Sequence, residues 1–91
     1  MNHDNLNLPE AVQFRIEEIR ARQRADHRGA VSIREASGLL GLAEITVRKK
    51  IGSGEIVSQK DGRARRIPIG EIYDRMVRVV VAGAAKPEAR K

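Results

Sequence analysis

The stretch VSIREASGLLGLAEITVRKKIGSGEIVSQKDGRARRIPI, residues 31–69, decides the fold. It opens with Ser32 and Glu35, which form the S-x-x-E capping box that marks the start of a helix. Apolar residues then recur at helical spacing, and Gly41 is placed to end this helix because glycine readily adopts positive φ. After two more residues, a second helix rich in Lys and Arg is expected to run as far as Gly52-Ser53-Gly54. The sequence therefore predicts two short helices joined by a tight turn.

A β-hairpin is predicted directly after the second helix. Residues 55–60 and 63–67 form its two extended runs, and Asp61-Gly62 lies between them. Asp-Gly favours a type I′ turn, in which both central residues have positive φ. Such a turn would pair the residues that flank it symmetrically, namely Lys60 with Arg63, Ser58 with Arg65, and Ile56 with Ile67.

Two further helices flank this stretch. Residues 8 to about 26 carry an apolar stripe at helical spacing, and Gly70-Glu71 begins a last helix that Gly83 and Pro87 are expected to end. The N-terminal helix could pack on the domain, pair with another copy of the chain or meet a partner. The apolar strip at 79–81 could belong to the core or contact another chain.

A helix, a turn, a cationic helix and a cationic hairpin together predict a winged helix-turn-helix. The expected fold class is mainly α with a small β-hairpin wing and an extra N-terminal helix. We expect a mostly helical N-terminal extension (1–28), whose first seven residues are disordered, then the winged helix-turn-helix domain (29–82) and a flexible basic tail (83–91).

Composition narrows the class of partner. The 91-residue chain has 18 Lys and Arg against 12 Asp and Glu, and this net charge of +6 is typical of nucleic-acid binders. One Phe, one Tyr and no Trp argue against a single-strand binder, which needs aromatic stacking platforms. No apolar run approaches the ~20 residues of a membrane span. We therefore expect double-stranded DNA as the partner, no membrane partner, and a cytoplasmic, nucleoid-associated protein.

The second predicted helix supplies the candidate base contacts, because the N-terminal half of this helix meets the base edges in a helix-turn-helix. Arg48 is expected to reach a guanine or a neighbouring phosphate, and Thr46 and Lys49 to hold the backbone. Glu44 either accepts from a cytosine amino group or lies at the positive end of the helix dipole. The candidate residues of this helix are Glu44, Ile45, Thr46, Arg48 and Lys49.

The hairpin supplies the candidate wing contacts. The predicted register puts Lys60, Arg63 and Arg65 on one face and Arg66 on the other. Like charges this close repel one another, and the wall of a narrow minor groove would supply the missing counter-charge. The candidate residues of the wing are Lys60, Gly62, Arg63, Arg65 and Arg66.

No pattern in the chain points to catalysis. His3 and His27 are isolated, without metal-ligand spacing around them. Gly52-Ser53-Gly54 lacks the preceding strand and the following Gly-Lys of a phosphate-binding loop. The chain is therefore expected not to be an enzyme, and neither a metal nor a cofactor is predicted.

The run from 31 to 73 resembles the excisionase-type winged helix, which is related to the MerR-type DNA-binding domain. The matching motifs are S-I-R-E-A, L-L-G-L, T-V-R-K, S-G-E-I, and K-D-G-R before R-R-I-P. Arg48 and Lys49 match the major-groove Arg pair of phage excisionases, with Lys in place of the second Arg. Lys60 and Arg63 match their minor-groove wing residues. Ile45 departs from the pattern, since those proteins have an acidic base contact there, and the N-terminal helix is an addition.

The resemblance implies a recombination directionality factor. Such proteins bind adjacent sites on attachment DNA, assemble cooperatively, bend the duplex and assist a site-specific integrase in excising a mobile element, with no catalysis of their own. A small winged-helix transcription regulator of phage or mobile-element genes is the main alternative. An interaction module with no role on DNA is the third.

Overall fold

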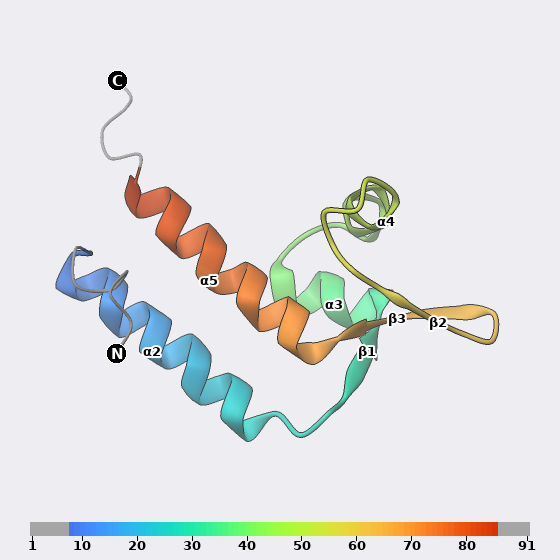
Figure 1. Cartoon of the computed structure of the whole chain (residues 1–91), viewed down its shortest axis with the longest axis horizontal. Coiled ribbons are helices and arrows are strands. Elements are labelled where there is room, and N and C mark those ends of the chain that lie inside the picture. The colour runs from blue at the N-terminus through green and yellow to red at the C-terminus, as the bar shows by residue number, and fades with distance from the viewer. Residues whose placement is uncertain (1–7, 86–91) are drawn as a thin grey trace.

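The computed structural model describes residues 8–85, which form four helices and a three-stranded antiparallel sheet (Figure 1). The first residues and the end of the predicted tail, 1–7 and 86–91, lie outside this range. The chain is mostly helical, and its order is consistent with a helix-turn-helix followed by a hairpin. The elements are α2 (Glu10–Ala25), β1 (Ala30–Ser32), α3 (Ile33–Leu40), α4 (Glu44–Gly52), β2 (Gln59–Asp61), β3 (Ala64–Pro68) and α5 (Ile69–Ala85).

The predicted boundaries of the two short helices are confirmed. Ser32 Oγ accepts from the Glu35 amide at 3.0 Å, and a Glu35 carboxylate oxygen accepts from the Ser32 amide at 2.9 Å, which completes the capping box of α3. Gly41 ends α3 with a φ of 70°. Helix α4 begins after Ala43, which provides no side-chain cap, and ends at Gly52.

The sheet contains one strand that the sequence analysis missed. Its order is β1-β3-β2, so the short strand β1 pairs with β3 and makes β3 the central strand. Val31 of β1 lies opposite Ile67 of β3, and neither side chain is exposed to solvent. This pairing fixes the start of α3 against the root of the hairpin, because Ser32 is both the last residue of β1 and the cap of α3.

The predicted hairpin register is wrong by two residues on the second strand, because the turn lies one residue further along the chain. Lys60 lies opposite Arg65, with Gln59 opposite Arg66 and Asp61 opposite Ala64, so the turn consists of Gly62 and Arg63. Gly62 has a φ of 65°, and no non-glycine residue in the described range has positive φ. A glycine at the first central position alone is typical of a type II′ turn, not type I′. This arrangement gives the positive φ to the residue with the smallest steric cost and leaves Asp61 extended.

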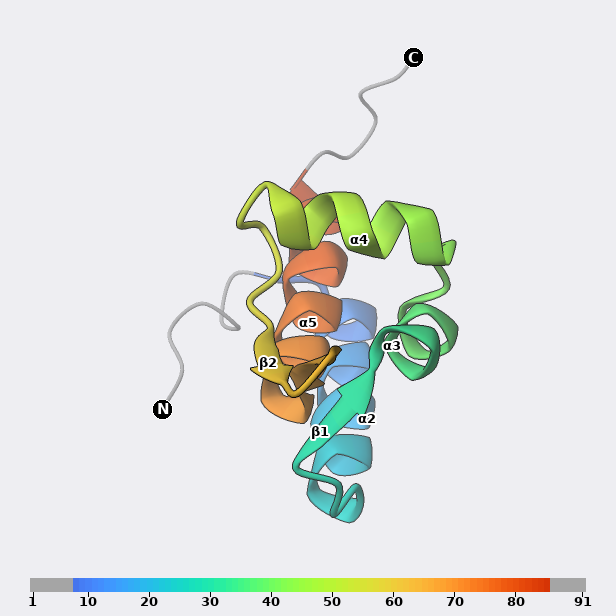
Figure 2. The ribbon, with the colours of Figure 1, turned by 90° about the vertical axis from the view of Figure 1, so that its right-hand side faces the viewer.

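The α2–α5 helix pair forms the side of the molecule away from the hairpin (Figures 1 and 2). Helix α2 runs antiparallel to α5 and buries Ile16 and Ile19. This packing agrees with the first of the three roles considered for the N-terminal helix. Helix α5 continues through Gly83, so the predicted end at Gly83 is wrong. Val79 is 59% exposed and does not belong to the core.

The main core lies between α3, α4, the sheet and α5. Its buried members are Val31, Ile33, Ala36, Val47, Ile56, Ile67 and Ile72. Ile56 lies outside β2 and therefore joins this core from the loop, not as the predicted strand partner of Ile67.

A polar cluster ties the end of α2 to α5. The Asp26 carboxylate, whose side chain is 9% exposed, accepts hydrogen bonds from Arg28 Nη2 at 2.6 Å and from the Tyr73 hydroxyl at 2.9 Å. The Arg28 guanidinium, with help from the Tyr73 hydroxyl, holds the pKa of this carboxyl well below its usual range. Burial raises the pKa of the Tyr73 hydroxyl. We call Asp26, Arg28 and Tyr73 the Asp26 cluster.

Candidate nucleic-acid interface

Helix α4 and the hairpin enclose a groove lined mainly by cationic and polar side chains. Its volume is about 300 Å³, and it lies between α4, the first turn of α3 and the β2–β3 hairpin. We call this space the cationic groove, and its charged and polar lining residues are Ser32, Arg34, Glu44, Arg48, Arg63 and Arg65. The structure thus brings together Arg48 of the second helix and Arg63 and Arg65 of the hairpin, which the sequence separates by a loop.

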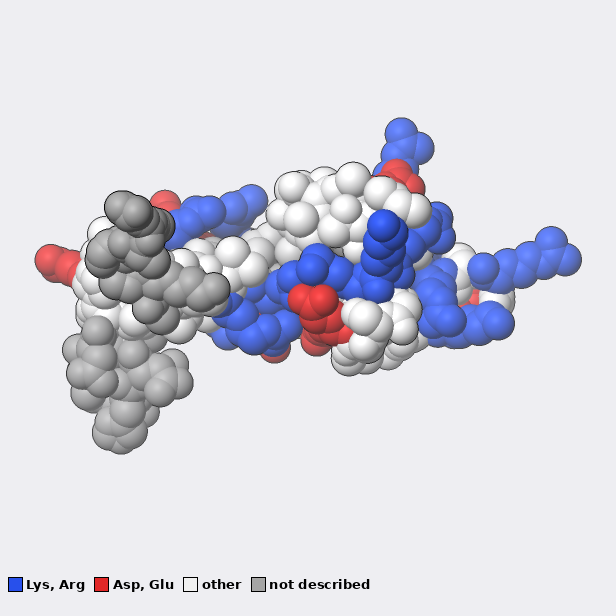
Figure 3. All heavy atoms as spheres, turned by 90° about the horizontal axis from the view of Figure 1, so that it is seen from above, with Lys and Arg blue, Asp and Glu red and all other residues white. Residues whose placement is uncertain are grey.

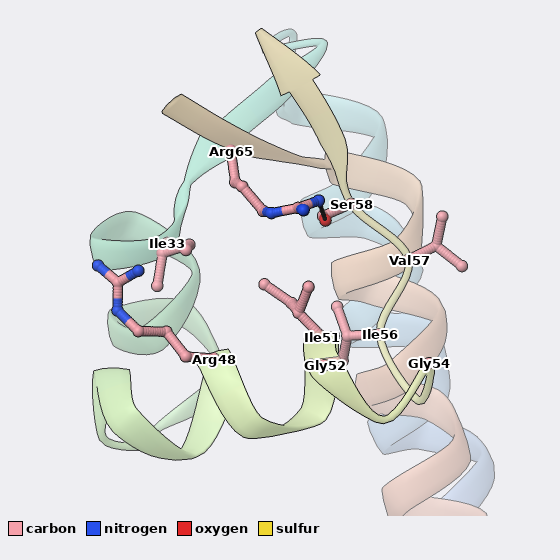
Figure 4. Close-up of a pocket in the computed structure, with 9 residues that line it drawn as sticks. All are labelled: Ile33, Arg48, Ile51, Gly52, Gly54, Ile56, Val57, Ser58 and Arg65. Atoms are coloured by element: carbon pink, nitrogen blue, oxygen red, sulfur yellow. Dashed lines mark hydrogen bonds between the residues drawn. The ribbon is translucent and has the colours of Figure 1, made fainter. Parts of the chain in front are cut away.

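A second hollow of about 540 Å³ continues from the cationic groove toward the root of the hairpin (Figure 4). Ile51 and Ile56 point into it, and Val57 points away. Arg65 donates a hydrogen bond to Ser58 Oγ at 3.0 Å, which holds its guanidinium along the inner side of the hairpin. Ile33, Arg48 and Arg65 line both spaces, so these three side chains lie where the two spaces meet.

The candidate residues of α4 lie on two adjoining faces. Glu44 and Arg48, four residues apart, both line the cationic groove. Ile45 and Lys49 occupy the next face and are exposed, Ile45 by 61%. Thr46 is half-buried. Figure 2 shows α4 lying across the end of the molecule with its outer side uncovered.

The observed register divides the cations of the hairpin between its two faces and its tip. Lys60 and Arg65 are direct cross-strand neighbours, and because Arg65 lines the cationic groove, their shared face is turned toward α4. Arg63 lies in the turn beside Gly62, at the tip. Arg66 is on the opposite face, where its Nε lies 3.4 Å from an Asp61 carboxylate oxygen. The hairpin therefore offers three cations in addition to one that is paired internally.

The surface formed by α4 and the β2–β3 hairpin differs from the rest of the molecule in its ion pairing. Within residues 8–85, Arg48, Lys49, Lys60, Arg63 and Arg65 take part in no ion pair. In contrast, ion pairs engage most cations outside this surface, including Arg20, Arg28, Lys50, Arg75 and Arg78. Figure 3 shows Lys and Arg side chains gathered over the hairpin end, with few carboxylates among them. A dense set of uncompensated cations favours a polyanionic ligand.

Two residues of this surface were missed by the sequence analysis. Arg34 lines the cationic groove from the first turn of α3, and Ser58 positions Arg65. The S-I-R-E motif contains Arg34, but its closeness to the hairpin depends on the pairing of β1 with β3, which no local pattern signals. Ser58 was assigned only a strand position.

The described part of the chain offers neither a cluster of metal ligands nor a helix that could span a membrane. Between residues 8 and 85 no group of three or more His, Cys, Asp or Glu is placed to hold a metal ion. No helix in the same range has the length and apolar character needed to cross a membrane. Comparison of the chain with protein-family models, curated proteins and solved structures finds no match.

Proposed function

We propose that the protein is a sequence-specific double-stranded DNA-binding protein of the winged helix-turn-helix type. The observation that carries this proposal is the set of five cations on α4 and the hairpin that have no ion-pair partner within residues 8–85, three of which line one groove. A phosphate backbone supplies the counter-charge that these side chains lack, and release of its condensed counterions contributes to affinity.

In this proposal α4 enters the major groove, which is wide enough to admit a helix. Arg48 contacts a guanine edge, and Lys49 holds a phosphate on the adjoining face. Ile45, exposed by 61%, offers an apolar surface of the kind that contacts thymine methyl groups. Glu44 lies at the N-terminus of α4, where its carboxylate interacts favourably with the positive end of the helix dipole.

The hairpin acts as the wing. Arg63 at the tip and the Lys60–Arg65 pair behind it contact the wall of the neighbouring minor groove, where negative potential is strongest when the groove is narrow. The hydrogen bond from Arg65 to Ser58 restricts one of these side chains before DNA arrives, which lowers the entropy lost on binding.

For the biological role we propose a recombination directionality factor, on the strength of the resemblance to excisionases. The protein would bind adjacent sites on attachment DNA, bend the duplex and assist an integrase that performs the strand cleavage. Bending a site of 20–30 base pairs costs on the order of 1–6 kcal/mol, which the contacts of α4 and the wing must offset. A transcription regulator would use the same interface on a promoter.

A footprint of the purified protein on DNA flanking its gene, including any attachment site, at two salt concentrations tests both levels of the proposal. Closely spaced direct repeats with hypersensitive bands support the directionality factor, and an excision assay with the integrase then follows. A single inverted repeat over a promoter favours the regulator. Absence of protection at low salt, or weak binding that does not respond to salt, contradicts DNA binding and favours an interaction module.

A further inference from the structure

A second, apolar groove lies on the side of the α2–α5 helix pair. Its volume is about 270 Å³, and it runs between α2, α5 and the end of α3. We call it the apolar groove. Its apolar lining includes Leu39, Leu40, Leu42, Met76, Val79 and Val80. None of these side chains is fully buried, and Val79 is 59% exposed, so the groove leaves apolar surface open to solvent.

Arginines form the rim of this groove. On α2, Arg15 and Arg22 flank the buried Ile19 at spacings of four and three residues, which puts all three on one face. Arg75 completes the rim from α5. No carboxylate is among the residues that line the groove in the described part of the chain.

The three rim arginines differ in whether a nearby carboxylate neutralises their charge. Arg75 Nη2 lies 3.3 Å from a Glu55 carboxylate oxygen and is only 15% exposed, so it is a structural residue. Arg15 lies 3.5 Å from Glu18, but both side chains are about half exposed. Arg22 is exposed and takes part in no ion pair within residues 8–85. The rim therefore presents positive charge at the edge of an apolar floor.

We propose that the apolar groove docks an acidic amphipathic helix from another protein. Apolar side chains of that helix would insert between α2 and α5, and its carboxylates would reach Arg15 and Arg22. Helix-in-groove recognition combines such anchors at spacings of three and four residues with a charged flank.

The net charge of the chain and the volume of the groove favour an acidic helix over two other occupants, a second copy of this chain and a small molecule. A second copy of this chain also carries a net charge of +6, so its approach is opposed by like charge. The groove volume of about 270 Å³ falls below the roughly 300–1,000 Å³ of small-molecule sites and suits individual anchor side chains.

This docking site is independent of the proposed DNA interface. No residue lines both the apolar groove and either of the spaces between α4 and the hairpin. The protein could therefore hold a duplex and an acidic helix at the same time, and failure of one site leaves the other untouched.

Fluorescence anisotropy of the full chain with labelled peptides provides the test. The probes are amphipathic helical peptides with Leu, Ile or Phe anchors and flanking Glu residues. The controls are the same peptides with Lys in place of Glu, and scrambled peptides of identical composition. We expect saturable binding only of the Glu peptides, weakened by added salt. Binding of neither set, or equal binding of the Glu and Lys sets, overturns the proposal.

Matched charge reversals locate the binding site. Arg22→Glu should weaken peptide binding by about 5-fold or more, since an attraction becomes a repulsion. Arg24→Glu, an exposed α2 residue that does not line the groove, should change it by less than about 2-fold. Equal losses for the two variants contradict the assignment.

An exposed apolar position tests the floor of the groove. Val79→Glu should abolish binding of the Glu peptides while circular dichroism shows an unchanged fold, because Val79 is already 59% exposed. Sedimentation of the protein without peptide tests the other possible occupant, a second copy of this chain. A dimer that Val79→Glu disperses assigns the groove to a second copy and overturns the proposal.

Discussion

The α2–α5 helix pair and the hairpin use the same kinds of charged residue in opposite ways. In the helix pair, Arg20 lies 2.8 Å from Asp74, and the Asp26 cluster closes the junction with α5. In the hairpin, every residue from 59 to 66 is exposed, and three of its four cations have no ion-pair partner within the described residues. Outside the rim of the apolar groove, the helix pair uses its charges mainly to hold the chain together, whereas the hairpin leaves most of its cations available to a ligand.

The difference teaches that the residues that stabilise the fold and the residues that we assign to DNA are located in separate parts of a small molecule. The buried side chains lie under the sheet and between the helices, while the cations that we assign to DNA are on its periphery. Substitutions should therefore fall into two groups, one that changes the free energy of unfolding and one that changes affinity alone.

The largest expected effect is on stability. Ile67→Ala removes a fully buried side chain from the central strand and should lower the free energy of unfolding by about 2–5 kcal/mol. Val57→Ala, at a position 59% exposed, should change it by less than about 0.5 kcal/mol. Urea denaturation followed by circular dichroism measures both. Similar losses in the two variants would mean that the core does not lie where the burial places it.

The next effect is on affinity. Arg48→Ala should weaken binding to the cognate duplex by ~1–3 kcal/mol and relax specificity, because Arg48 is assigned to a base edge. Lys60→Ala should weaken binding to all duplexes and reduce the salt slope by about 1, because Lys60 is assigned to the backbone. Arg24→Ala, which removes an exposed cation that lines neither the cationic groove nor the hollow beside it, is the matched control. Equal losses for Arg48→Ala on cognate and random duplexes reject its base-reading role.

The turn of the hairpin gives a smaller effect on stability. Gly62→Val should destabilise the protein by about 1–2 kcal/mol, because a side chain is strained at a φ of 65°. Gly83→Ala should have the opposite sign and stabilise by up to about 1 kcal/mol, because Gly83 lies within α5 with open space around it. Thermal melting of both variants tests this contrast, and a melting temperature for Gly62→Val equal to that of the wild type would contradict the assigned turn.

Local sequence patterns predicted the short helices correctly. They failed for the elements whose structure depends on residues distant in the sequence. The capping box at Ser32 and the left-handed Gly41 are signals contained within a few residues, and both are observed. The register of the hairpin differed because Gly62, not Asp61, leads the turn, a choice that depends on how the strands below it pair. Strand β1 has no periodic signal in three residues and exists because β3 lies beside it.

The candidate surface was predictable in composition but not in geometry. The sequence indicated the cations of the second helix and the hairpin and put Arg66 on the other face of the hairpin, yet it gave no reason to place Arg34 among them. The placement of Arg34 follows from the pairing of β1 with β3. Gly83 failed as a helix end because the alanines around it favour a helix, and a single exposed glycine costs only about 1 kcal/mol there.

The smallest expected effect concerns pH and the Asp26 cluster. Arg28 and Tyr73 hold the pKa of Asp26 below its ordinary value. The ionised carboxylate therefore stabilises the folded state at every pH above that ordinary pKa. This contribution is lost as pH falls from the ordinary carboxyl range, near 4, toward the lower pKa of the folded state. Between about pH 5 and pH 8 it should be constant.

Asp26→Asn isolates this contribution. The variant should be less stable than the wild type at neutral pH, and the two unfolding free energies should converge as the pH is lowered below about 4. Denaturation curves at a series of pH values measure the difference, with DNA affinity at neutral pH as the control that should not change. A gap that stays constant into strong acid would show that the Asp26 carboxylate is not held by these partners.

The pairing of Val31 with Ile67 also bears on how the protein is made. The two halves of this strand pair lie on either side of α3, α4 and the hairpin loop in the sequence. During synthesis, the ribosome must therefore release the chain beyond β3 before β1 can find its partner. Until then, α3 and α4 have no sheet to pack against, so the nascent chain cannot present a finished binding surface. The domain assembles in a late step, when its central strand emerges.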